Sequence, residues 1–370
     1  MLTKKISMFD RIQNINAIVG DNAVVINGNV TINDEVLSKV AYQLLKSELD
    51  ILTVEAKEQM KARVNECVKS VLEQMVSKKL ESTLSDFSMP STQFAFYSVL
   101  KGFSAVETIE QRELLVDAFI ERIQTQWDSS EKMIIDSAIE VLPKLSPQIL
   151  STIGLLQIRH QLTNAPIGFM LHQYFASLTP LAEKMALVDF LDIEYLKQER
   201  LILPLPGLQI AVSLEQYLLS QYDLFFRHPL REGVYEDYCR VHPEAHESVT
   251  DKPTRACMMC IDATRNNETS FCCANSKFLK KTLLERHQEY IIPHVEELMR
   301  MMPPFTEEEV RRYFLNLSPS WERLFELFSS DSFKLYTLSI TGNYIGGKVL
   351  AKACHGKSLA LADYKHPASL

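Results

Sequence analysis

The chain has 370 residues, of which 46% are hydrophobic and 23% charged, and this composition is typical of globular proteins that bury a core. Eleven glycines are few for this length, which argues against a glycine-rich β-protein and favours long helices. The formal net charge of −8 argues against a protein that binds nucleic acid over its whole surface.

The sequence carries no sign of a secretory signal or a membrane span. The N-terminal residues lack an apolar stretch, and the longest apolar run, residues 201–212, is interrupted by Pro204 and Pro206. We therefore expect a cytoplasmic protein. In that reducing compartment, clustered cysteines bind metals more often than they form disulfides. The odd number of cysteines, seven, also fits poorly with complete disulfide pairing.

Residues 12–33 differ in composition from the rest of the chain, being rich in asparagine, isoleucine and valine with two glycine-containing turn signals. This pattern predicts three short strands, over residues 12–19, 23–27 and 30–33. Such strands are too short to close a core, and their exposed edges need a partner. We therefore predict that residues 1–33 form a β oligomerisation segment that pairs between copies of the protein. The alternative is a hairpin lying on its own helical domain.

Residues 34–198 have the hydrophobic periodicity of a helical domain. A long helix is expected after a Thr53 cap, because apolar residues recur there at spacings of three and four: Val64, Val68, Val71, Leu72, Met75 and Leu80. Ser146-Pro147 and Thr179-Pro180 each combine an N-cap with a proline at the first helical position. They predict helices to about residues 161 and 197.

Residues 199–370 mix short strands with helices and predict a C-terminal lobe. Residues 199–213 read as one or two strands around a Pro-Gly turn, and residues 333–340 as a strand before a final helix. Helices are expected between them at 214–226, 276–292, 294–302, after Thr306 and after Ser318. A capping box, Thr306-x-x-Glu309, marks the start of the helix expected after Thr306.

A Cys/His insertion at residues 228–275 holds five of the seven cysteines. Two pairs have the spacing of metal knuckles, Cys239-x2-His242 and Cys257-x2-Cys260, with fourteen residues between them. Zinc prefers four tetrahedral thiolate or imidazole ligands, so these four residues predict a zinc site. The spare candidates that can replace Cys239 or His242 are His246, Cys272 and Cys273. The segment is poor in large hydrophobic residues, so we expect metal binding to order it.

Two other interpretations of this insertion remain open. It can be a flexible loop with free cysteines, or it can hold a catalytic zinc, which needs an open coordination position and a general base. His242-x-Glu244 ahead of Cys257-x-x-Cys260 resembles the zinc deaminases, but Ala256 stands where those enzymes have proline. No HExxH motif is present. The pattern therefore favours a structural zinc.

Residues 342–348 match the G-x4-G-K pattern of a P-loop after a predicted strand. Val349 occupies the position where Ser or Thr must coordinate magnesium, and no alternating strand-helix pattern precedes it. We therefore reject nucleotide hydrolysis. The glycines are expected to let a short helix pack closely against a strand.

Three phrases together resemble an uncharacterised bacterial family: GDNAVVINGNVTIN at 20–33, AIEVLPKLSP at 138–147 and LSITGNYIGG at 338–347. The plan is also distantly similar to the abortive-infection alpha proteins, in which a helical region precedes a winged-helix-like end. Together with the patterns above, the resemblance predicts a mainly α fold with a short N-terminal β-segment, a helical domain and a C-terminal winged-helix-like α+β lobe. The Cys/His loop of that lobe comes from this sequence alone, because most members of the family lack it. The resemblance also implies a bacterial accessory protein encoded near mobile elements and acting in phage defence.

These observations predict a non-enzymatic, homo-oligomeric sensor or scaffold of an anti-phage defence system, with a structural zinc and a protein partner. The first alternative is a zinc-containing nucleic-acid-binding regulator. A local basic patch is compatible with it (Lys277, Lys280, Lys281 and Arg286), although a solvated helix face explains that patch better. The second alternative is a zinc-dependent enzyme acting on nucleotides.

Overall fold

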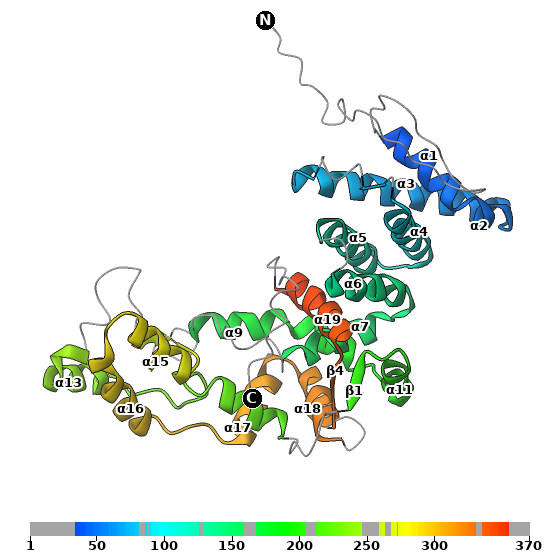
Figure 1. The fold of residues 1–370 in the computed structure, drawn as a ribbon. Helices are drawn as coiled ribbons and strands as arrows, with labels where there is room; N and C mark the ends of the chain where they lie inside the picture. The colour runs from blue at the N-terminus through cyan, green and yellow to red at the C-terminus, as the bar shows by residue number, and fades with distance from the viewer. Residues whose placement is uncertain are drawn as a thin grey trace, which may run out of the picture. The chain divides into compact units, whose positions relative to one another are not determined.

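A computed structural model describes residues 34–80, 86–87, 89–125, 129–158, 168–204, 212–245, 259–262, 268–271, 273–330 and 335–354. Within these ranges the protein is mainly helical, as the sequence predicted (Figure 1). The predicted β oligomerisation segment, residues 12–33, lies outside them. None of the helices described in these ranges is both long enough and apolar enough to span a membrane.

Contacts between residues divide the chain into two compact units. The first unit runs up to Pro147 and also includes Ile340–Ile345, and the second comprises Gln148–Ser339 and the chain from Gly346 onwards. The division therefore falls at Pro147, earlier than the boundary that we expected after residue 198.

The first unit is built from helices that pack around α3 and α4. Its elements are α1 (Asp34–Leu44), α2 (Lys46–Asp50), α3 (Val54–Ser77), α4 (Pro90–Ala105), α5 (Ile109–Gln124), α6 (Ser130–Val141) and the 3-10 helix η2 (Leu142–Lys144). Thr53 caps α3, as predicted, because its hydroxyl accepts a hydrogen bond from the Ala56 amide. The predicted apolar stripe of this helix is buried from Val64 to Met75.

The second unit begins with α7 and contains all the strands that the structure describes. Its elements before the Cys/His segment are α7 (Pro147–Leu156), α9 (Gly168–Ser177), α10 (Thr179–Met185), α11 (Phe190–Gln198), β1 (Ile202–Pro204) and α12 (Leu214–Gln221). Those that follow are α13 (Val234–Val241), β2 (Met259–Asp262), β3 (Glu268–Phe271), α15 (Ser276–Glu285), η5 (Glu289–Ile291), α16 (Ile292–Met301), α17 (Glu307–Leu317), η6 (Pro319–Trp321), α18 (Glu322–Ser329), β4 (Tyr336–Leu338) and, from Gly346 onwards, α19 (Ile340–Ala353).

The single helix predicted from Thr179 to about residue 197 is wrong, because two helices occupy this stretch. The α10 helix ends at Met185, and Asp189 starts α11 with a capping box. The Asp189 carboxylate accepts a hydrogen bond from the Asp192 amide (3.0 Å), and the Asp192 carboxylate accepts one from the Asp189 amide (3.1 Å). These two bonds satisfy amides that a new helix start leaves exposed.

Two short strands that are far apart in the sequence pair in an antiparallel sheet. Ile202 lies opposite Leu338, and Pro204 lies opposite Tyr336. The predicted strand at residues 333–340 is therefore too long, because β4 covers only Tyr336–Leu338 and helix α19 begins at Ile340. Of the one or two strands predicted over residues 199–213, the structure describes β1.

The glycines of the P-loop-like motif lie inside helix α19, and the close packing that we predicted against a strand is found, at Gly346, against another helix. A Cβ atom at Gly346 would lie 2.7 Å from the Ile153 carbonyl oxygen of α7. A Cβ atom at Gly154 of α7 would lie 2.7 Å from Val349 Cγ1 of α19. Each helix therefore presents a glycine where the two helices approach most closely. The amides of a helix interior bond within the helix, so this motif forms no phosphate-binding loop.

The chain leaves and re-enters the body of the second unit along two segments that are hydrogen-bonded to each other. The His228 amide donates to the Pro303 carbonyl oxygen (3.0 Å), and the Phe305 amide donates to the Phe226 carbonyl oxygen (2.9 Å). Residues 228–303, here called the inserted module, are thus closed at their base. The predicted insertion at residues 228–275 is too short, because α15 and α16 belong to the same module.

The inserted module has a hydrophobic core of its own, in which α13, α15 and α16 pack together (Figure 1). Leu224, just ahead of the module, packs with its buried members, which are Leu230, Tyr235, Tyr238, Cys239, Ala245, Phe271, Leu279, Leu283, Ile291, Val295, Leu298 and Met302. We expected the Cys/His segment to bury too little apolar surface to order itself. The polar stretches behind this expectation, residues 248–256 and 264–267, lie outside the described residues, so it stays a prediction.

The capping box of α17 gives a direct test of the local structure that the sequence predicted. Thr306 Oγ1 accepts a hydrogen bond from the Glu309 amide (3.2 Å), and Glu309 Oε2 accepts one from the Thr306 amide (2.8 Å). We expect Thr306→Ala to lower the free energy of unfolding by about 1 kcal/mol, measured by urea denaturation. Thr306→Ser keeps the capping oxygen and should retain most of this stability. Equal losses in both variants would contradict the capping role.

Candidate metal centre

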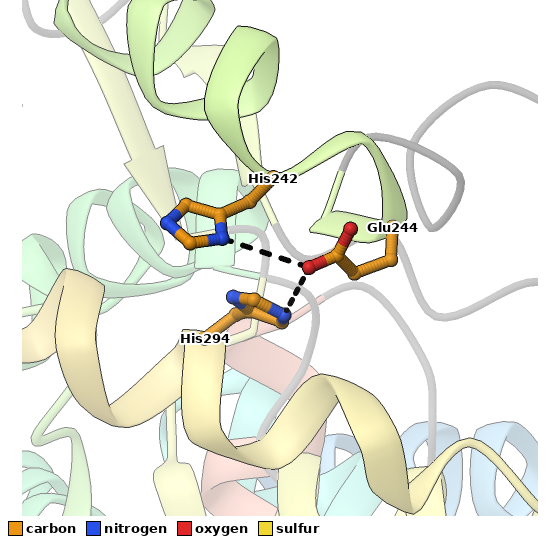
Figure 2. Close-up of side chains that lie close together, drawn as sticks. All are labelled: His242, Glu244 and His294. Atoms are coloured by element: carbon orange, nitrogen blue, oxygen red, sulfur yellow. Dashed lines mark ion pairs between the residues drawn. The ribbon is translucent and has the colours of Figure 1, made fainter.

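Two histidines and one glutamate meet between the end of α13 and the start of α16. His242 is the C-cap of α13, where its amide donates to the Tyr238 carbonyl oxygen (2.9 Å), and Glu244 lies in the helical residues 243–245 that follow. His294 lies in the first turn of α16. Figure 2 shows both imidazole rings directed at the carboxylate of Glu244. The distances to its Oε1 are 3.6 Å from His242 Nδ1 and 3.1 Å from His294 Nε2.

The other ring nitrogen of His294 is held by a second pair of residues. His294 Nδ1 lies 2.8 Å from the hydroxyl oxygen of Tyr238, and this hydroxyl donates to Glu297 Oε2 at 2.9 Å. A tyrosine hydroxyl has one proton, and the Glu297 carboxylate accepts it. The Tyr238 oxygen therefore accepts a hydrogen bond from His294 Nδ1, and Nε2 is the ring nitrogen that faces Glu244.

Local electrostatics favour a charged Glu244 and a neutral Tyr238. The pKa of the Glu244 carboxyl is lowered, first by a hydrogen bond with its own backbone amide and then by His294 and His242. Burial raises the pKa of the Tyr238 hydroxyl, and the hydrogen bond to Glu297 raises it further. The site thus offers one carboxylate and two imidazoles, held beside a phenol that keeps its proton.

Among the described residues, His242, Glu244 and His294 form a group of potential metal ligands whose ligand atoms all lie within 4.8 Å of one another. Two imidazoles and a carboxylate suit zinc, which binds nitrogen and oxygen ligands of this kind. Three protein ligands leave room for a fourth from water or another side chain. The arrangement is chemically able to fix the two helix ends to each other, or to hold a water molecule on the metal.

Of the predicted ligands, only His242 belongs to this group within the part of the chain that the structure describes. Cys239 is buried in the core of the inserted module, where burial raises the pKa of its thiol. Cys273 is half-buried, and its thiol donates to the Asn275 carbonyl oxygen (3.4 Å). Cys260 lies in β2, where its backbone is paired with Ser270 of β3. Cys257, His246 and Cys272 lie outside the described residues.

His294 was not predicted from the sequence, and Glu244 was considered only as part of a deaminase-like pattern. The sequence spacing places the residues of each of two pairs next to each other, but it does not bring the two pairs together. Tyr238 and His242 are four residues apart, as are successive side chains on one helix face, and His294 and Glu297 are three apart. No spacing rule joins the two pairs, because 56 residues separate Tyr238 from His294.

The predicted basic patch lies on and just beyond α15 and is partly neutralised by acidic neighbours. Lys280 Nζ lies 2.7 Å from Glu296 Oε1, and Lys281 Nζ lies 3.9 Å from Glu285 Oε1. Surface pairs of this kind contribute little to stability, but they reduce the local positive charge.

Comparisons with known proteins give a family but no activity. A protein-family model whose description names no reaction or ligand matches residues 32–363, most of the chain. No curated protein and no solved structure is significantly similar to the chain.

Proposed function

The chain belongs to the family whose model matches residues 32–363, and we propose that it is a cytoplasmic, non-enzymatic sensor or scaffold that presents its inserted module to a protein partner. The observation that carries the proposal is the construction of residues 228–303. They have their own hydrophobic core and a base closed by two hydrogen bonds between entry and exit segments. A module attached in this way can carry a binding surface while the rest of the unit folds around other contacts.

We further propose that the module contains one structural zinc ion, because potential ligands gather between its helices. A metal that links α13 to α16 would add its binding free energy to the folding of the module. The protein then assembles as a homo-oligomer through residues 12–33, which leaves several copies of the module available to one partner. Several linked modules bind a multivalent partner far more tightly than one.

The setting that we propose is bacterial defence against phage. It rests on the resemblance to the abortive-infection alpha proteins, whose plan places a winged-helix-like lobe after a helical region. The antiparallel pairing of β1 with β4 next to the helices of the second unit is compatible with such a lobe.

Removing the inserted module tests this function. A variant in which a short Gly-Ser linker joins Arg227 to Pro304 keeps the two segments that lie side by side at the base. We expect it to stay folded and oligomeric, by circular dichroism and native mass spectrometry, and to lose protection of a bacterial host against a phage panel. Protection equal to that of the full chain would contradict the proposal. A Gly-Ser linker of equal length inserted elsewhere, between Met185 and Asp189, is the matched control.

A nucleic-acid-binding regulator is the second candidate, and one observation favours it. Lys277, Lys281 and Arg286 are exposed on or next to the single helix α15. Binding to random DNA that weakens steeply as salt rises, and that is reduced by replacing these three side chains with glutamine, would support this candidate over the scaffold.

A further inference from the structure

We propose that His242, Glu244 and His294 bind one zinc ion, and that Tyr238 and Glu297 orient His294 for it. The inference rests on the proposed function, because it names the protein ligands of the zinc in the inserted module. It also departs from the sequence-based ligand set, since it assigns Cys239 to the hydrophobic core.

The distances between the candidate ligand atoms fit a tetrahedral metal. Zinc bonds to imidazole nitrogen and carboxylate oxygen are about 2.1 Å long, so two ligand atoms of one tetrahedral zinc lie about 3.4 Å apart. His242 Nδ1 and His294 Nε2 lie 3.6 Å and 3.1 Å from Glu244 Oε1. One distance is slightly longer and the other slightly shorter than the separation expected for two ligands of one zinc ion. Zinc binding therefore needs only small adjustments of these side chains.

The hydrogen bonds of His294 fix which of its ring nitrogens is available to a metal. Tyr238, which is itself hydrogen-bonded to Glu297, lies 2.8 Å from His294 Nδ1, so Nε2 is the nitrogen directed at Glu244 Oε1, 3.1 Å away. Metal-binding histidines commonly donate their second ring proton to an oxygen in this way.

One zinc ion can contact all three groups at once. The ring centroids of His242 and His294 are 5.1 Å apart, so both imidazoles lie within reach of a single ion beside the Glu244 carboxylate. A divalent cation would accept a lone pair from each imidazole and offset the charge of the carboxylate.

The location of the group also fits a metal that joins two helix ends. Tyr238 is buried at the edge of the module core, and the His294 side chain is only 12% exposed, so these residues are held in place by packing. The Glu244 side chain is 44% exposed, which gives an ion access from solvent. The site is thus rigid on its inner side and open on its outer side.

Zinc titration of the full-length protein, stripped of metal by a chelator and dialysed, tests the assignment. We expect one zinc per chain, and a more than 100-fold weaker Kd in His294→Gln and in Glu244→Gln. Tyr238→Phe should still bind one zinc but about 10-fold more weakly, since changes to outer-shell partners typically cost 10–100-fold in affinity. The matched control is His228→Gln, which removes another histidine paired with a glutamate and should keep the wild-type Kd.

Two outcomes overturn the inference. The first is a chain that binds one zinc equally well with and without His294 and Glu244, while Cys257→Ser or Cys260→Ser abolishes binding. In that case the zinc of the proposed function stands, and only its ligand set changes. The second is that the full chain binds no zinc. The scaffold proposal is then tested by the module deletion alone. Apo-state melting curves of the variants, compared with the apo wild type, separate lost ligands from lost folding.

Discussion

Replacing Phe314 with alanine is expected to lower the free energy of unfolding of the second unit by about 3–5 kcal/mol. Phe314 is buried in the centre of an aromatic cluster, with ring centroids 4.8 Å from both Phe175 and Trp321 and 5.7 Å from Phe325. The truncation removes the transfer free energy of the ring and leaves a cavity that these rings cannot fill without leaving their packed positions. Urea denaturation, monitored by the fluorescence of Trp321 in a Trp127→Phe background, measures the loss of stability with a probe that lies beside residue 314.

Phe190→Ala is the matched control for this prediction. The same side chain is removed, but Phe190 is 63% exposed at the start of α11, so the expected change is within about 0.5 kcal/mol. Similar losses in the two variants would contradict the location of the core. The two units of the chain need not unfold together, which is why the probe reports on the second unit alone.

Gly346→Ala is expected to destabilise the protein by about 1–3 kcal/mol, although alanine is the better helix former. In an open helix position, the exchange of glycine for alanine would stabilise by about 1 kcal/mol. Here the new Cβ would lie 2.7 Å from the Ile153 carbonyl oxygen, a backbone atom that cannot rotate away. The sign of the measured change in melting temperature therefore reports directly on the approach of α7 to α19.

Gly154, the glycine of α7 that faces α19, gives a comparison with Gly346. At Gly154 the nearest atom to a new Cβ is Val349 Cγ1, which belongs to a side chain. Gly154→Ala should therefore be rescued in part by Val349→Ala, whereas truncating the side chain of Ile153 should not rescue Gly346→Ala. A stabilising Gly346→Ala would show that the two helices lie further apart than described.

Local signals in the sequence were sufficient to predict much of the fold. The caps at Thr53 and Thr306 and the apolar stripe of α3 are all found as expected, because each depends on residues within one or two helical turns. The predictions that were wrong depended on longer contacts. Helix α19 begins at Ile340, ahead of the Gly342 motif where a turn was expected, and Gly346 within it packs against a helix nearly two hundred residues away in sequence.

The candidate site was predictable only in part for the same reason. Residues 235, 238, 239 and 242 fall on one face of a helix, and this spacing, if applied, predicts Tyr238 and Cys239 to be buried. The knuckle spacing Cys239-x2-His242 also fits that helix, so the pattern of a metal site and the pattern of a packed helix coincide in these residues. The contact with His294 arises only when α13 folds onto α16.

Native mass spectrometry of the full chain, purified without chelator, tests the central claim most directly, namely that the inserted module holds one zinc ion. The predicted result is a mass excess of one zinc per chain in every assembled copy, absent from Glu244→Gln and from His294→Gln and present in His228→Gln. Wild-type chains whose mass equals that of the polypeptide alone, with the module still folded by circular dichroism, would contradict it.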